Sequence, residues 1–189
     1  MATGTRGVSL HPFFGHADLQ ASLSKAWAVE ALPASLLIHG PRGVGKQRLA
    51  LWLGQLLLCP ESGPTGPCGD CKGCRMLLNL EHPDLHWYFP LAKPKGVRPN
   101  KLAEAMEEAR YDALTERREQ TLRPSASATE PTGLYLAVAQ TLRSHAHRRP
   151  VVGLRQVFVI GDAEMLVPQE SSQEAANALL KLLEEPPTS

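Results

Sequence analysis

"GPRGVGKQ", residues 40–47, is the stretch that decides the fold. It follows the apolar run "ASLLIH" and leads into "KQRLALWLGQLLL", residues 46–58, where apolar residues recur at helical spacing. Strand, glycine-rich turn and helix in this order are typical of a phosphate-binding loop, whose backbone N–H groups face an anion. A plain glycine-rich turn is the alternative. The pattern G-x-x-x-x-G-K-[ST] predicts nucleotide contacts at Gly40, Pro41, Arg42, Gly43, Val44, Gly45, Lys46 and Gln47.

Gln47 stands where this pattern has serine or threonine. The usual hydroxyl is a magnesium ligand, and an amide on a longer stem does not take its place without moving the ion. We therefore expect the loop to keep its phosphate contacts, with Lys46 as the cation, while the placement of magnesium is impaired.

A second departure lies in "VFVIGDAEML", residues 157–166. In P-loop ATPases an apolar strand of this kind is followed by two carboxylates, one for magnesium and one for the attacking water. Here Gly161 takes the magnesium position and Asp162 the water-polarising position. A register shifted by one residue makes Asp162 the metal ligand but leaves Ala163 in place of the base. Neither register completes a catalytic site, so Asp162 is interpreted as a remnant of one, with a solvated turn as the alternative.

All four cysteines lie within residues 59–74, in the pattern C-x₈-C-x₂-C-x₂-C. Turns of the type C-x₂-C present two sulfurs to one metal, and four thiolates suit tetrahedral zinc. Two disulfides are the alternative, although a reducing cytoplasm and the short spacing disfavour them. The pattern predicts a structural Zn²⁺ held by Cys59, Cys68, Cys71 and Cys74.

The rest of the chain alternates between helical and strand-like segments. Helices are expected over 17–27, 101–120 and from 134, and a last one in "SSQEAANALLKLLEE"; strands are expected in "DLHWYFPLA" and at 157–160. The Ser/Thr/Pro/Ala-rich residues 121–133 predict a flexible insertion. Strands that alternate with helices indicate the α/β class with a parallel sheet.

Composition excludes several classes of protein. A hydrophobic content of 43% fills a core, while no run approaches the length of a membrane span. The first residues lack the apolar segment of a secretory signal, so a cytoplasmic location is expected. The net charge of +1 creates no global attraction to nucleic acid, so any contact with DNA must be local or supplied by partners.

Taken together, these motifs identify a family. "GPRGVGK", the cysteine segment after the loop helix, "HPDLHW", "VFVIGDAEML" and "EAANALLKLLEEPP" occur in the order and spacing of bacterial replication clamp-loader subunits. The chain resembles the N-terminal AAA+ module of the delta-prime type in the DNA polymerase III holoenzyme, with the gamma/tau type as close relative. The resemblance covers nearly the whole chain outside 121–133, and "FFGH", residues 13–16, falls where the family's adenine-side segment begins, with a hydrophobic staple at a strand end as the alternative.

The resemblance implies an AAA+ P-loop NTPase-type fold with an inserted Cys₄ zinc module, residues 59–74, in a pentameric ATP-driven machine. Its partners are expected to be other clamp-loader subunits and, through the assembly, the sliding clamp and primer-template DNA, with no membrane. Delta-prime subunits are stators with a weakened nucleotide site, which fits Gln47 and Gly161. The alternative is an ATP-hydrolysing gamma/tau-type motor in which Glu164 or the shifted register restores magnesium.

The family pattern continues beyond "LLEEPP" with a sensor 1 strand, a lid and a collar. None of these follows in the sequence, so residues 1–189 are expected to form a partial AAA+ domain. In the family fold the next strand lies between the loop strand and the "VFVI" strand, and its absence leaves their edges open. A third hypothesis, an unrelated zinc-ribbon nucleic-acid binder, is disfavoured by the neutral charge.

Overall fold

The computed structural model describes residues 10, 13–119, 131–166 and 174–184. The chain divides into two compact units, one formed by residues 1–86 with 150–159 and the other by residues 87–149 with 160–189. Each unit buries its own set of apolar side chains. Within the described ranges, no helix combines the length and the apolar character that crossing a membrane requires.

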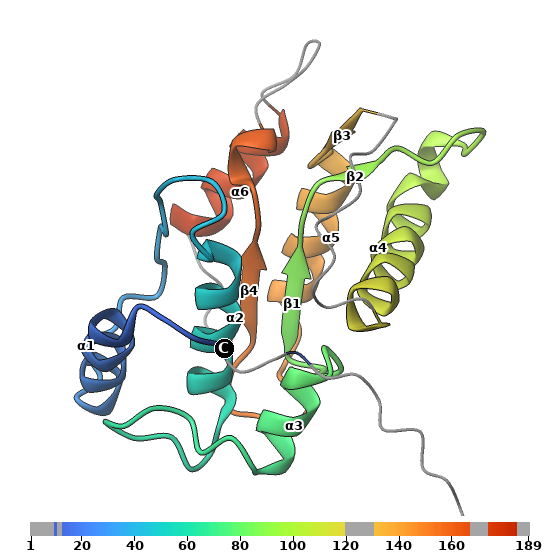
Figure 1. Cartoon of the computed structure of the whole chain (residues 1–189). Helices are drawn as coiled ribbons and strands as arrows, with labels where there is room; N and C mark the ends of the chain where they lie inside the picture. The colour runs from blue at the N-terminus through green and yellow to red at the C-terminus, as the bar shows by residue number, and fades with distance from the viewer. Residues whose placement is uncertain (1–9, 11–12, 120–130, 167–173, 185–189) are drawn as a thin grey trace, which may run out of the picture. The chain divides into compact units, whose positions relative to one another are not determined.

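The first unit is built around one buried helix (Figure 1). It contains α1 (Ala17–Ala28), α2 (Lys46–Leu58) and α3 (Lys72–Leu78), and both α1 and α3 pack against α2. After Arg48, α2 carries no charged residue, and Leu51 and Leu56 are 2% and 0% exposed. These observations confirm the expected helices at 17–27 and 46–58, whereas α3 was not anticipated.

Gly54 explains how closely α2 approaches the first strand. A Cβ atom at this position would lie 3.0 Å from Leu85 Cδ1 and 3.7 Å from Val157 Cγ1. Glycine inside a helix costs about 1 kcal/mol relative to alanine. The cost is offset here because the bare backbone lets two apolar side chains pack directly against α2.

The strands β1 (Leu85–Tyr88) and β4 (Val157–Ile160) form a two-stranded sheet. The N–H of Val157 donates to the carbonyl of Asp84, and the N–H of Gly161 donates to the carbonyl of Tyr88, both at 2.8 Å. From the first bond to the second, the residue numbers rise along both strands, so the pairing is parallel. The mixed α/β class, with a small parallel sheet, and the strand at 157–160 are thereby confirmed.

The strand expected immediately before the glycine-rich loop is not present. Residues 35–39 have no strand assignment, and Leu36 and Leu37 are 46% and 84% exposed. The apolar pattern is real, but an extended segment becomes a strand only when a neighbour pairs with its N–H and C=O groups. Among the described residues, no segment pairs with this run.

Within the described residues, the second unit contains three α-helices and a short antiparallel pair of strands. The helices are α4 (Leu102–Glu119), α5 (Leu136–Ala146) and α6 (Glu174–Glu184), and α5 packs against both of the others (Figure 1). The single-turn helices η1 (Pro99–Lys101) and η2 (Ala163–Leu166) belong to the same unit. The three expected helices are confirmed; the serines expected to cap the last one, and residues 121–130 of the expected insertion, lie outside the described residues.

The last two residues of the expected insertion lie in a short strand. β3 (Thr132–Gly133) pairs antiparallel with β2 (Leu91–Ala92), so that Leu91 faces Gly133 and Ala92 faces Thr132. A two-residue strand is too short to show the alternation of apolar and polar residues that indicates a strand. The composition of residues 121–133 therefore gave no indication of this pairing.

α4 is more than the charged surface helix that its sequence suggests. Arg110 is only 5% exposed; it pairs with Glu107 at 2.8 Å and lies 5.0 Å over the ring of Tyr88. Arg117 lies 3.6 Å over the ring of Phe89. Cations stacked on aromatic faces therefore hold α4 to the aromatic run at the end of β1.

Candidate metal centre and phosphate loop

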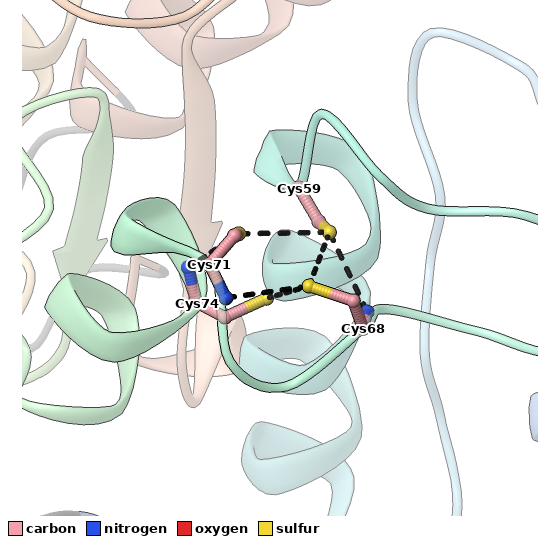
Figure 2. A group of neighbouring side chains, drawn as sticks. All are labelled: Cys59, Cys68, Cys71 and Cys74. Carbon is pink, nitrogen blue, oxygen red and sulfur yellow. Dashed lines mark hydrogen bonds between the residues drawn. The ribbon is translucent and has the colours of Figure 1, made fainter.

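The four cysteines of the first unit converge at one point. Figure 2 shows their side chains turned toward one another, from the end of α2, the following loop and the start of α3. The sulfur atoms all lie within 4.8 Å of one another. The separations are 3.5 Å for Cys59 and Cys68, 3.8 Å for Cys59 and Cys71, and 3.9 Å for Cys68 and Cys74. None of the four is disulfide-bonded.

Backbone N–H groups support these sulfurs. The N–H of Cys68 donates to Cys59 Sγ at 3.5 Å, that of Cys71 to Cys68 Sγ at 3.4 Å, and that of Cys74 to Cys71 Sγ at 3.3 Å. Gly73 allows α3 to approach α2, because a Cβ there would lie 3.1 Å from the carbonyl oxygen of Leu58. The local backbone thus fixes where each thiol points, as the shell around a metal ligand does.

Burial differs among the four thiols, and Cys71 is intermediate. Cys59 and Cys74 are buried, and burial raises the pKa of both thiols above the ordinary value. Cys68 is exposed, and the backbone N–H groups of Cys71 and Asp70 lower its pKa. A divalent cation would override these differences, since a coordinated thiol is deprotonated outright.

This arrangement is compatible with tetrahedral zinc. With Zn–S bonds of about 2.3 Å, a regular tetrahedron holds its sulfurs about 3.8 Å apart. The three separations given above bracket that value. All four ligand places are taken by cysteine, so the site leaves no position for a substrate or a reactive water. The geometry fits a structural role, and the identity of the metal stays a prediction.

The glycine-rich loop lies in the same unit and leads into α2. Gly40, Gly43 and Gly45 have φ angles of 150°, 78° and 91°, a region that side chains with a Cβ rarely adopt. Gly45 is the residue before α2, so the helix N-terminus opens directly at the loop. Lys46 Nζ donates to the carbonyls of Gly40 and Pro41, at 2.8 and 2.9 Å. The lysine is therefore held at the loop, where an anion would meet it.

The segment "FFGH" lies against this loop. His16 Nε2 donates to the carbonyl of Val44 at 2.9 Å, and a Cβ on Gly45 would lie 3.5 Å from the ring of Phe13. A trans peptide points its C=O and the following N–H in opposite directions. The N–H of Gly45 therefore points away from the bond between His16 and Val44.

Comparison with known proteins connects these features. A family model described as DNA polymerase III, delta subunit, matches residues 15–189 and so includes both the loop and the cysteines. The chain belongs to the DNA polymerase III delta subunit family.

Two curated relatives carry the same name, DNA polymerase III subunit delta'. The Pseudomonas aeruginosa protein (strain PAO1) is 29% identical over 150 residues, which is 79% of this chain and 33% of the relative. The Escherichia coli protein (strain K12) is 32% identical over 153 residues, which is 81% of this chain and 33% of the relative. The chain thus spans about a third of the length of the curated relatives it matches.

In this member of the DNA polymerase III delta subunit family, the two residues at the expected magnesium positions lie in different units. Gln47 is in the first turn of α2, half-buried, in the first unit. Gly161 and Asp162 follow β4 in the second unit. Asp162 is exposed, with a φ angle of 50°, and its charge acts on the guanidinium of Arg117. The interpretation of Asp162 as a catalytic remnant stays a prediction.

One buried carboxylate of this family member was missed by the sequence analysis. Asp84 is fully buried and accepts three backbone hydrogen bonds, from Val151 and, at 2.8 Å each, from Val152 and Gly153. Burial alone would raise the pKa of Asp84, but these donors outweigh it and hold the pKa below its ordinary value. The signal available was an acidic residue in "HPDLHW" that directly precedes an apolar strand.

Asp84 is a structural residue rather than a ligand-binding one. His82, buried beside it, accepts the N–H of Asp84 at Nδ1 over 3.2 Å. Burial lowers the pKa of His82, so the neutral ring is favoured at this acceptor position. The carboxylate fixes the loop that leads into β4, and so sets where that strand begins.

Proposed function

We propose that this chain is the AAA+ part of a clamp-loader subunit of bacterial DNA polymerase III, of the delta-prime type, and that it acts as a stator without ATP hydrolysis of its own. The observation that carries the proposal is the pair of residues at the magnesium positions. Gln47 offers an amide in place of a hydroxyl, and Gly161, after β4, has no side chain. Without these two anchors, Mg²⁺ cannot neutralise charge on the transferred phosphate.

The loop itself retains features that suit a phosphate. These features are three glycines with positive φ, the N-terminus of α2 and the cation of Lys46. These features support a P-loop of AAA+ type that can still bind phosphate but has lost its magnesium ligands. Family membership supports the delta-prime assignment, since both curated relatives bear that name.

The cysteine cluster would hold a structural Zn²⁺ through Cys59, Cys68, Cys71 and Cys74. The ion would fix the segment between α2 and α3, which has few apolar side chains to bury. Its role in the proposed stator is mechanical: the zinc module would make the first unit rigid.

The partners follow from the same proposal. A stator acts inside a hetero-oligomer, so the chain would contact other clamp-loader subunits, and through the assembly the sliding clamp and primer-template DNA. With a replication role, the protein would act in the cytoplasm.

Calorimetric titration with Mg²⁺-ATP tests the proposal. We expect the native chain to bind Mg²⁺-ATP more weakly than about 1 mM, and the double substitution Gln47→Thr with Gly161→Asp to gain at least about tenfold. The reason is that the two substitutions restore an oxygen ligand at each magnesium anchor. Gln47→Thr alone is the matched partial variant, and melting curves check that Gly161→Asp, at a buried position, still folds. Micromolar binding by the native chain would favour the ATP-hydrolysing gamma/tau-type motor instead.

A further inference from the structure

One side-chain amide is buried in the apolar helix α2. Gln55 is 8% exposed, and after Arg48 it is the one residue of α2 with an amide, hydroxyl or charged side chain. Moving an amide from water into an apolar place is unfavourable unless a partner takes up its hydrogen bonds. The position of Gln55 therefore calls for a polar partner inside the first unit.

Gln55 lies on the side of α2 that faces α3. Its side chain lines a small cavity together with Leu51 of the preceding turn and Leu77 of α3. Leu77 stands one turn after Cys74, and both are 1% exposed, so they share the buried face of α3. Gln55 also stands one turn before Cys59, and its carbonyl accepts the N–H of Cys59 at 3.0 Å. It is thus a neighbour of both buried cysteines of the candidate metal centre.

The partner of the amide is one of the four sulfurs. Burial raises the pKa of the Cys74 thiol, and a hydrogen bond from the side chain of Gln55 to Cys74 Sγ offsets part of that rise, as does the backbone N–H of Gly69. A donor to sulfur favours the thiolate, which is the form of cysteine that binds a metal. The amide therefore favours the same form of Cys74 as a metal ion does.

A metal ion at this site would bring a net negative charge into a buried place. Four thiolates carry more negative charge than Zn²⁺ balances. Water can solvate the exposed Cys68, whereas Cys74 is buried and depends on donors from the protein. A neutral thiol is a weak acceptor, so the hydrogen bond from Gln55 gains most when Cys74 is a thiolate.

We propose that Gln55 is a positioning residue for the metal, whose amide donates to Cys74 Sγ, orients this thiolate toward the ion and stabilises its charge. The inference rests on the proposed zinc site and adds to it a residue outside the four ligands. Groups that hydrogen-bond to metal ligands typically contribute about 10–100-fold to metal affinity. An amide that served packing alone would act equally with and without zinc.

Competition between the 189-residue chain and a chromophoric zinc chelator tests this inference. The test variant is Gln55→Met, which keeps the length of the side chain and removes the amide. The matched control is Leu77→Met, a change of similar volume at the same cavity that removes no donor. We expect zinc affinity to fall at least about tenfold in Gln55→Met and less than about threefold in Leu77→Met.

Melting curves separate a role at the metal from a role in packing. Without zinc, Gln55→Met should melt at the temperature of the native chain or above it, because an apolar side chain replaces a buried amide. With limiting zinc, it should melt below the native chain, since its weaker binding stabilises the fold less.

Equal zinc affinity in Gln55→Met and the native chain would overturn the inference and leave the zinc site in place. A zinc-free Gln55→Met that loses as much melting temperature as the zinc-bound form would assign Gln55 to packing and overturn the inference as well. A native chain that binds no zinc would overturn the zinc site and the inference together. The assay contains no nucleotide, so the stator proposal is tested separately.

Discussion

Removal of the proposed zinc ion is expected to lower the melting temperature of the chain by at least about 10 °C. Structural zinc sites contribute several kcal/mol of folding energy, because the ligands converge only in the folded state. Without the ion, the two buried thiols, Cys59 and Cys74, would keep only weak hydrogen bonds, such as those among the four cysteines. The measurement is a thermal melt followed by circular dichroism, with zinc quantified before and after chelation.

The matched variants for this experiment are Cys74→Ser and Cys68→His. Serine at the buried position removes a ligand and should reproduce the chelated melt, whereas Cys₃His is an established zinc ligand set and should preserve most of the stability. Return of the original melt on adding zinc would show that the loss is reversible. If the purified chain contains only traces of zinc and chelation leaves its melt unchanged, the cluster is not a metal site.

Loss of the Asp84 carboxylate is the second large effect that we expect. Asp84→Ala leaves the three N–H groups of Val151, Val152 and Gly153 without their acceptor, at a place that is only partly buried because Val151 and Val152 are exposed. A donor that stays unpaired costs about 1–3 kcal/mol, and water reaches part of this place, so a total loss of about 2–4 kcal/mol is expected. Asp84→Asn keeps one acceptor oxygen and should lose less. Urea denaturation gives both values.

The same carboxylate makes a definite prediction about acid. The pKa of Asp84 in the folded chain lies below the ordinary value of about 4. Its contribution to stability is therefore complete at pH values above about 4. The contribution is lost as the pH falls from about 4 through the folded-state pKa. The stability difference between the native chain and Asp84→Asn should therefore be constant above about pH 5 and shrink below about pH 4. A difference that does not shrink in acid would contradict this account of Asp84.

The sequence pattern predicted a helix or strand correctly where the element is long or its apolar residues recur at a regular spacing. α2 begins at Lys46 and ends at Leu58, as the apolar spacing predicts, and β4 coincides with the strand-like "VFVI". The cysteine spacing also predicts the convergence of the four sulfurs, because C-x₂-C turns have few ways to fold. In these cases the information lies within about a dozen neighbouring residues.

Sequence reasoning failed where the outcome depends on partners distant in the chain. Residues 35–39 have the composition of a strand, but no neighbour pairs with them within the described residues, so Leu37 is exposed. The ladder between β2 and β3 joins segments about forty residues apart and is too short to have a period.

The least predictable features are polar groups at buried places. Arg110 and Arg117 belong to a helix that is charged along its length, and nothing local distinguishes them from solvated neighbours. Their stacking on Tyr88 and Phe89 depends on how α4 packs. Asp84 is similar, since its partners are three N–H groups more than sixty residues away.

ATP turnover by the assembled clamp loader, measured with the native chain and with Lys46→Ala, tests the central claim most directly. Lys46 is the cation of the loop and is essential to hydrolysis in an active P-loop site. If the protein is a stator, the assembly needs it to load the sliding clamp, and turnover is the same with both forms. If Lys46→Ala lowers turnover by the share of one active site or more, this chain hydrolyses ATP, and the interpretation of Gln47 and Gly161 as lost magnesium anchors is wrong.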